Sequence, residues 1–159
     1  MGLFSFVKNA GARLFGKKEE EVAAVAPSQE ELDSRKADQL LGLIDGLGFK
    51  VDSLFVAVED DVATIAGTAL NQADREKVIL AVGNVEGISQ VDDQMKVPVP
   101  EPVAQFHTVV SGDSLSGISK KYYGSYNKYM HIFEANQPML KTPDLIYPGQ
   151  VLRIPELSA

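Results

Sequence analysis

Between residues 28 and 97, the pattern of hydrophobic and polar positions predicts five short elements. A helix should begin at Ser28, because Ser28 and Glu31 have the spacing of a capping box. The side chains that form the apolar face of this helix are Leu40, Leu41 and Ile44.

Two apolar runs that follow this helix predict a β-hairpin. Residues 54–58 and 62–66 are its expected strands, joined by an acidic turn, and Gly67 should break the second strand. Residues 72–82 then show a helical pattern, and residues 91–97 predict a further strand. The expected order is therefore helix, strand, strand, helix, strand.

A second, smaller unit follows. Residues 108–110 predict a strand, after which Asp113 is placed to cap a helix. The next helix should bury Tyr129 on its apolar face, and residues 151–154 predict a closing strand. The chain should thus be an α+β protein with an αββαβ domain and a smaller βααβ domain.

The first residues of the chain predict an amphipathic helix, with Leu3, Val7, Ala10 and Leu14 on one face. They lack the basic start and unbroken apolar run of a secretory signal peptide. The apolar stretch is also too short to cross a membrane. Packing of this helix onto its own domain is favoured, and binding along a membrane surface is the alternative.

These patterns divide the chain into five segments. They are the N-terminal amphipathic helix 1–16, a linker 17–27, the αββαβ domain 28–97, a proline-rich linker 98–104 and the βααβ domain 105–156. Alternate prolines favour the extended polyproline conformation, so the second linker should separate the domains without fixing their angle.

Composition and charge narrow the possible functions. The 159 residues include no Cys, which excludes disulfides and thiolate metal sites. Residues 1–18 carry a charge of +4, residues 19–104 carry −12, and residues 105–159 carry +1. The acidic middle would repel phosphates, so nucleic acid is not an expected partner, whereas cations would be attracted.

Several spaced motifs lie in the last 50 residues, namely Gly112-Asp113-Ser114-Leu115, Asn136-Gln137-Pro138 and Ile146-Tyr147-Pro148-Gly149-Gln150. Together they resemble the lysin motif (LysM), a βααβ module that usually binds N-acetylglucosamine polymers such as peptidoglycan. The resemblance implies a groove for a glycan, or for docking of another domain. Its residues would be Gly112, Asp113, Ser114, Leu115, Asn136, Pro138, Asp144, Leu145 and Ile146.

The five-element order, with Val58-Glu59-Asp60-Asp61-Val62 and Val85-Glu86-Gly87-Ile88, resembles the BON domain. The two domains after a Met-Gly-Leu-Phe start resemble the bacterial cytoplasmic potassium-binding proteins of BON–LysM architecture. This resemblance implies a cytoplasmic protein that binds K⁺, changes conformation and serves in osmotic or potassium stress, and we expect it to be a monomer. The LysM domain would then contact the BON domain instead of a cell wall.

The sequence offers two places for a K⁺ site built from backbone carbonyls, the ligands that selective K⁺ sites commonly use. Such carbonyls are free at the carboxyl ends of helices. One group would come from the expected N-terminal helix and the other from the glycine-containing loop after residue 82. The expected ligands are the carbonyls of Val7, Ala10, Gly83, Val85 and Ile88.

No catalytic arrangement is recognisable, so we expect no enzyme. His107 and His131 have no neighbour at metal-ligand spacing and should be packed or surface side chains. The pairs Asp60-Asp61 and Asp92-Asp93 should be solvated rather than a divalent-metal site. A peptidoglycan-binding adaptor and a membrane-surface protein remain the alternatives to K⁺ binding.

Overall fold

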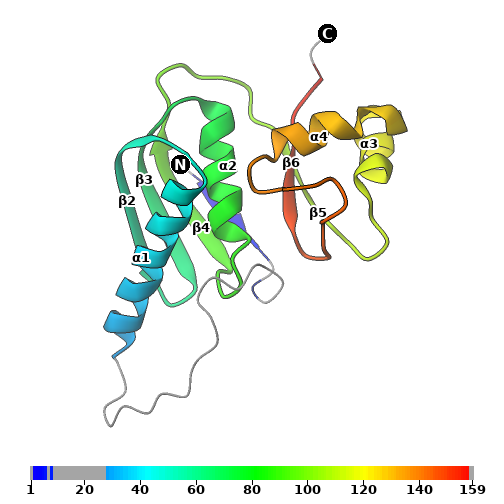
Figure 1. Ribbon diagram of the computed structural model, residues 1–159. Helices are drawn as coiled ribbons and strands as arrows, with labels where there is room; N and C mark the ends of the chain where they lie inside the picture. Colours follow the sequence, from blue (N-terminus) through cyan, green and yellow to red (C-terminus); the bar gives the residue numbers. More distant parts are fainter. Residues whose placement is uncertain (1, 7, 9–27, 158–159) are drawn as a thin grey trace.

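The computed structural model describes residues 2–6, 8 and 28–157, which form two α+β domains side by side (Figure 1). The N-terminal domain has a four-stranded sheet of order β1-β4-β3-β2, with helices α1 and α2 packed on it. The C-terminal domain has a two-stranded sheet, β5-β6, and two α-helices. The predicted α+β class and both element orders are confirmed.

Helix α1, Gln29–Gly46, begins where the sequence predicts. The Ser28 hydroxyl accepts from the Glu31 amide, and the Glu31 carboxylate accepts from the Ser28 amide, so the capping box is complete. Leu40 and Ile44 are fully buried against the sheet. Their burial holds α1 on the domain core.

The hairpin consists of β2, Val51–Glu59, and β3, Val62–Ala69. The acidic turn is where it was expected, but Gly67 does not break β3. Instead, β2 has an irregularity in pairing between Asp52 and Phe55. A side chain at position 67 would come within 2.8 Å of the Asp52 carbonyl, so glycine lets the two strands approach there.

Helix α2, Gln72–Gly83, lies in the middle of the molecule and leads into β4, Gln90–Lys96. Strand β4 runs parallel to β3. The end of α2 is buried, and the residues of the loop after it are buried or half-buried, which is unusual for a connection between a helix and a strand.

The N-terminal residues differ from the prediction. Residues Gly2–Ser5 form strand β1, antiparallel to β4, instead of the first turn of an amphipathic helix. Phe6 is buried and Leu3 is exposed, which fits the two-residue period of a strand. Most of the remainder of the expected helix lies outside the described residues.

The C-terminal domain contains β5, Gln105–Thr108, α3, Leu115–Tyr123, a 3₁₀ turn at Tyr126–Lys128, α4, Tyr129–Ala135, and β6, Val151–Ile154. The cap of α3 is Ser114, which accepts from the Gly117 amide, so the assignment of Asp113 as the cap was wrong. Tyr129 is partly exposed rather than buried. The first strand also lies a few residues earlier than expected.

The two domains share one apolar cluster. Val151 is buried within the N-terminal domain core, and Phe106 and Met139 pack against that core. The rings of Phe4 in β1 and Phe106 in β5 lie 5.4 Å apart. None of the helices in the described parts of the chain is long and apolar enough to cross a membrane.

Candidate functional site

The loop that follows α2 is the centre of the candidate site. Helix α2 ends at Gly83, and Asn84 is its C-cap, with its amide bonded to the Leu80 carbonyl. Gly87, at φ +102°, allows the loop to turn back toward β4. Because the last carbonyls of a helix have no intrahelical partner, this loop concentrates backbone oxygens at the negative end of the helix dipole.

The N-terminal segment runs beside this loop. The Phe6 amide donates to the Ser89 carbonyl at 2.8 Å, and the Gly87 amide donates to the Lys8 carbonyl at 2.6 Å. The Phe6 ring covers Gly83 so closely that a β-carbon there would lie 2.1 Å from the ring. The two chain segments that the sequence analysis selected for K⁺ therefore meet, although the first begins as a strand.

Three of the five expected ligands lie together in this loop. Gly83, Val85 and Ile88 are all buried. Within the described part of the chain, no hydrogen bond is seen to the carbonyls of Gly83 and Ile88, whereas the Val85 carbonyl accepts from the Ile88 amide at 3.1 Å. Val7 and Ala10 lie outside the described residues. Neutral carbonyl oxygens of this kind suit a large monovalent cation.

Asp61, in the turn between β2 and β3, connects the hairpin to the same region. Its carbonyl accepts from the Ser89 amide at 2.9 Å, and its carboxylate lies 3.5 Å from the Lys8 ammonium. Hydrogen bonding from the Ser89 side chain, followed by the charge of Lys8, holds the pKa of Asp61 below its ordinary value. The sequence predicted only a solvated turn residue at this position. Asp61 instead connects the hairpin to the N-terminal segment and to the loop after α2.

Asp93 also differs from the expectation of a solvated acid pair. Its side chain is buried and lies 2.9 Å from the Arg75 guanidinium. Asp92 points to the other face of β4, so the two carboxylates do not form a joint site. Nowhere in residues 2–6, 8 and 28–157 do three or more His, Cys, Asp or Glu side chains gather as metal ligands.

The side chain of Asn84 leaves the loop and reaches the C-terminal domain. Its Nδ2 donates to the Val151 carbonyl at 2.8 Å, and its Oδ1 accepts from the Val151 amide at 2.9 Å. The Tyr147 hydroxyl lies 3.5 Å from the Asn84 carbonyl. A single residue of the candidate loop thus contacts Tyr147 and Val151 of the other domain, and its Nδ2 also lies 3.4 Å from the Met139 sulfur.

A buried ion pair forms the second polar contact between the domains. The Glu76 carboxylate in α2 accepts from the Arg153 Nε at 2.9 Å, and both side chains are almost completely buried. Glu76 also accepts from the Ala104 amide at 3.1 Å, and Glu101 accepts from the Gln72 amide at 3.0 Å. The proline-rich linker is therefore bonded to α2, whereas the sequence predicted a spacer that leaves the angle between the domains open.

Sequence reasoning missed Asn84, Glu76 and Arg153 because their partners are distant in the chain. A usable signal exists only for Arg153. It stands between Leu152 and Ile154 in a short strand, on the same face as Val151. A strand with apolar residues on both faces is expected to be covered on both faces. The face of β6 that carries Arg153 should therefore pack against another part of the protein.

Comparison with known proteins identifies both domains. The BON domain model matches residues 39–98, and the LysM domain model matches residues 107–155. Over 98% of this chain and 99% of the relative, the chain is 46% identical to the "Potassium binding protein Kbp" of Escherichia coli O6:H1. The chain belongs to this BON–LysM family.

An uncharacterised protein of Deinococcus radiodurans is 51% identical over 49 residues, which is 31% of this chain and 19% of that protein. Both the BON and the LysM domains are binding domains, and the family member from Escherichia coli is named for binding and not for a reaction.

The hydrogen bonds and the ion pair described above between the domains come from Tyr147, Val151 and Arg153, which are not groove positions. Leu115 and Ile146 pack in the LysM core. Most of the other groove positions are exposed, among them Gly112, Ser114, Asp144 and Leu145, and Asp113 is partly exposed. Asn136 is buried and bonds to β6. Docking was expected around Leu115, Pro138 and Ile146; of these, Leu115 and Ile146 pack within the LysM domain, whereas Pro138 lies beside α2.

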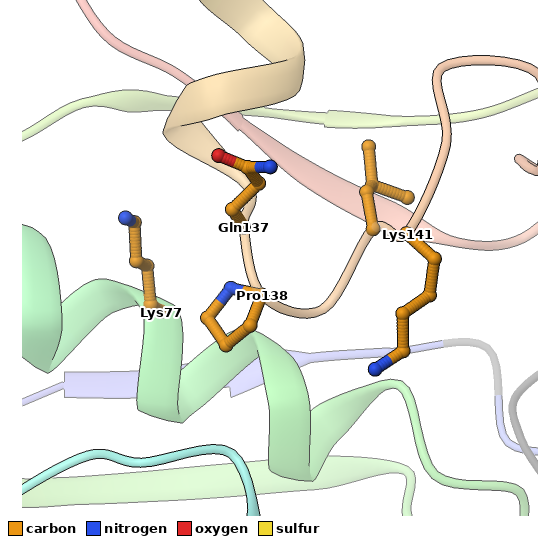
Figure 2. A pocket seen from close by; sticks show the side chains of 5 residues that line it. Lys77, Gln137, Pro138 and Lys141 are labelled. Carbon is orange, nitrogen blue, oxygen red and sulfur yellow. The ribbon is translucent and has the colours of Figure 1, made fainter.

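Pro138 is the groove position nearest to the BON domain. It follows a cis peptide bond and lines a cleft of about 510 Å³ together with Lys77 of α2. Figure 2 shows Pro138 between the side chains of Lys77 and Lys141, which lie on opposite sides of it. Because the two ammonium groups do not converge, this cleft is not built to hold one anion.

The histidines have structural environments. His107 is buried, with Nδ1 2.9 Å from the Tyr122 hydroxyl and Nε2 2.8 Å from the Asp113 carboxylate. The Val110 amide, and then His107, hold the pKa of Asp113 below its ordinary value. His131 stacks edge-on against Tyr123. These contacts confirm the interpretation of both as packed side chains.

Proposed function

We propose that this protein binds K⁺ in the cytoplasm and changes conformation on binding, as part of a response to osmotic or potassium stress. The observation that carries the proposal is the contact between the N-terminal segment and the loop at residues 83–88. A full-length relative named for potassium binding supports the choice of ion.

The chemistry of the loop favours a monovalent cation. Mg²⁺ and Ca²⁺ prefer carboxylate oxygens, often several around one ion. The carboxylate beside the loop, Asp61, is already occupied by Lys8 and Ser89. The carbonyls of Gly83 and Ile88 offer neutral oxygens instead, and carbonyls of Val7 and Ala10 would complete the shell from the N-terminal segment. The oxygens of such a shell take the place of the water molecules around K⁺ and add no negative charge to the site.

Ion binding would order the loop against the N-terminal segment. That loop also contacts the LysM domain through Asn84, and β1 contacts it through Phe4. An ion that favours the closed arrangement of loop and segment would therefore favour the docked arrangement of domains, by its differential affinity for the two. This is the conformational response that we propose.

A glycan-binding LysM domain is the second candidate function. It is favoured by one observation, the exposure of Gly112, Ser114, Asp144 and Leu145 when the domains are docked. The groove would remain accessible to an N-acetylglucosamine polymer, so glycan and ion binding are compatible in one molecule. A protein serving a cell wall would, however, be recovered outside the cytoplasm in fractionation.

Titration calorimetry on the full chain tests both candidates. K⁺ should produce saturable heat, whereas Na⁺, Mg²⁺ and Ca²⁺ at the same concentration should produce little. Oligomers of N-acetylglucosamine should be titrated separately, with and without K⁺. Saturation by Ca²⁺ or Mg²⁺ in place of K⁺ would show that the site uses carboxylates and would overturn the proposal. Binding of the oligomer alone would favour the second candidate.

A further inference from the structure

The outer edge of β6 has an unusual set of partners. Val151 and Arg153 direct their amide and carbonyl groups away from β5, as alternate residues of an antiparallel edge strand do. The Asn136 side chain donates to the Arg153 carbonyl at 3.0 Å and accepts from its amide at 2.8 Å. The Asn84 side chain makes the same pair of bonds to Val151. Two asparagine amides thus take the place of a neighbouring strand.

The two asparagines come from different domains. Asn136 follows α4 in the LysM domain, so its bonds to Arg153 are internal to that domain. Asn84 belongs to the BON domain, so the Val151 amide and carbonyl have these partners only while the domains are docked. Undocking would expose that part of the strand edge together with the apolar side chains of Val151 and Phe106.

Asn84 also directly follows Gly83, whose carbonyl is a proposed ligand, and precedes Val85, whose carbonyl accepts from the Ile88 amide. Its side chain is buried and is held by two hydrogen bonds, with a further contact from Nδ2 to the Met139 sulfur at 3.4 Å. A residue held at its side chain cannot change its backbone direction freely. The flanking carbonyls are therefore held in one arrangement while the LysM domain is docked.

We propose that Asn84 is a positioning residue that couples ion binding in the loop to docking of the LysM domain. This inference rests on the proposed function and assigns its coupling to one side chain. Docking presets the carbonyls, so an ion entering the docked form has less chain to order and binds more tightly. Since coupling is reciprocal, the bound ion favours docking by the same factor.

The variant that tests this role from the BON side is Asn84→Leu. Leucine has the same branching and the same number of side-chain heavy atoms as asparagine, although it is larger. It fits the C-cap dihedral angles of −84° and 9° and carries no charge that would itself attract K⁺. It cannot bond to Val151. The matched control is Asn127→Leu, at an exposed position in the 3₁₀ turn of the LysM domain.

A second variant removes one of the same bonds from the LysM side. Val151→Pro lacks the amide that donates to Asn84, and proline is tolerated on an edge strand where that amide points away from the neighbouring strand. Because the two substitutions act on the same contact from opposite domains, combining them should add little to either one alone.

Three measurements on the full chain follow the coupling. Calorimetry gives the K⁺ affinity, small-angle scattering gives the radius of gyration with K⁺ or Na⁺, and amide exchange by NMR gives protection of the Val151 amide. The parent protein and Asn127→Leu should become more compact with K⁺, and their Val151 amide should become more protected. Asn84→Leu should lose both responses and bind K⁺ about tenfold more weakly, since a buried pair of bonds is lost.

The outcomes separate this inference from the function on which it rests. Absence of K⁺ binding by the parent protein would remove the proposed function itself. Normal K⁺ affinity in both Asn84→Leu and Val151→Pro, with a parent protein that binds K⁺, would overturn only the role of Asn84. The role of Asn84 would also be overturned if, in Asn84→Leu, the Val151 amide exchanged faster while K⁺ affinity stayed unchanged. Weakened binding in both variants, without further loss when combined, would support the coupling.

Discussion

At the scale of single residues, the absence of a side chain at position 83 brings the N-terminal segment onto α2. The Phe6 ring occupies the space in which a β-carbon would stand. Phe6 is itself buried, and its amide bonds to Ser89 at the end of the loop. Position 83 therefore determines how closely the two proposed halves of the ion site approach.

Gly83→Ala should weaken K⁺ binding more than it lowers the stability of the fold. The methyl group would force Phe6 out of its place, and overpacking of this kind costs about 1–3 kcal/mol. Alanine also favours the helix by roughly 1 kcal/mol relative to glycine, so the net loss of stability should be about 0–2 kcal/mol and the melting temperature should fall by no more than about 8 °C. K⁺ affinity, measured by calorimetry, should fall at least about tenfold because the N-terminal carbonyls are displaced.

The matched control for this substitution is Gly42→Ala, which lies in the middle of α1 with no atom within 4 Å of the added carbon. It should raise the melting temperature and leave K⁺ affinity unchanged. A Gly83→Ala protein with parental K⁺ affinity would show that close contact of Phe6 is not needed for the site.

At the scale of elements, local sequence determines some helices and strands and leaves others open. Helix α1 is predictable because both bonds of its capping box join residues three positions apart. Strand β1 is not, because its few residues fit a helical period as well as a two-residue period. What selects the strand is pairing with β4, with Gly2 opposite Asp93. Local periodicity contains no information about that partner.

The candidate site likewise has one part that local sequence predicts and one part that it does not. The loop at 83–88 was predictable because a helix that ends at a glycine leaves free carbonyls. The contact of Asn84 with Val151 was not, since the two residues are 67 positions apart and asparagine at a helix end is ordinary. Arg153 and Glu76 are 77 positions apart and were missed for the same reason.

The β5–α3 connection gives a prediction about pH. Asp113 accepts from Val110 and His107, and these contacts lower its pKa. A carboxyl whose pKa is depressed by folding stabilises the fold above its unfolded pKa and loses this contribution as pH falls through the folded value. Asp113→Asn should therefore lower the melting temperature at pH 7, and its difference from the parent should shrink below about pH 4.

The control for this pH series is Asp144→Asn, an exposed carboxylate of the same domain. Its melting temperature should follow that of the parent protein at every pH. An Asp113→Asn deficit of equal size at pH 7 and pH 3 would show that the effect comes from lost hydrogen bonding alone and not from the charge of the carboxylate.

At the scale of the whole molecule, three segments meet at Glu76. This buried carboxylate accepts from Arg153 of β6, from the linker amide of Ala104 and from Gln72 of its own helix. The LysM domain cannot leave the BON domain without separating Glu76 from Arg153. Docking and folding of the second domain should therefore be linked in one cooperative unit.

Glu76→Gln should make the two domains unfold separately. Removing one partner of a buried ion pair leaves the other charge uncompensated, at a cost of roughly 3–5 kcal/mol. We expect denaturant unfolding to change from one transition in the parent protein to two in the variant, the earlier one belonging to the LysM domain. Tyrosine fluorescence can follow that domain, in which all five tyrosines lie.

Glu134→Gln, an exposed substitution on α4, is the control and should keep a single transition. Replacing the pair together, as Glu76→Gln with Arg153→Met, should recover part of the lost stability because no buried charge remains. Failure of the double variant to recover any stability would show that the hydrogen bonds of Arg153 to its own domain matter more than its ion pair.

The contact of Asn84 with Val151 also has a consequence for synthesis. The ribosome makes the loop and the N-terminal strand well before it makes β6. A chain that lacks β6 has no strand edge for Asn84 to hold, even if its BON domain folds. Such chains would bind the ion more weakly, so that K⁺ would be taken up mainly by chains in which β6 has been made and has docked.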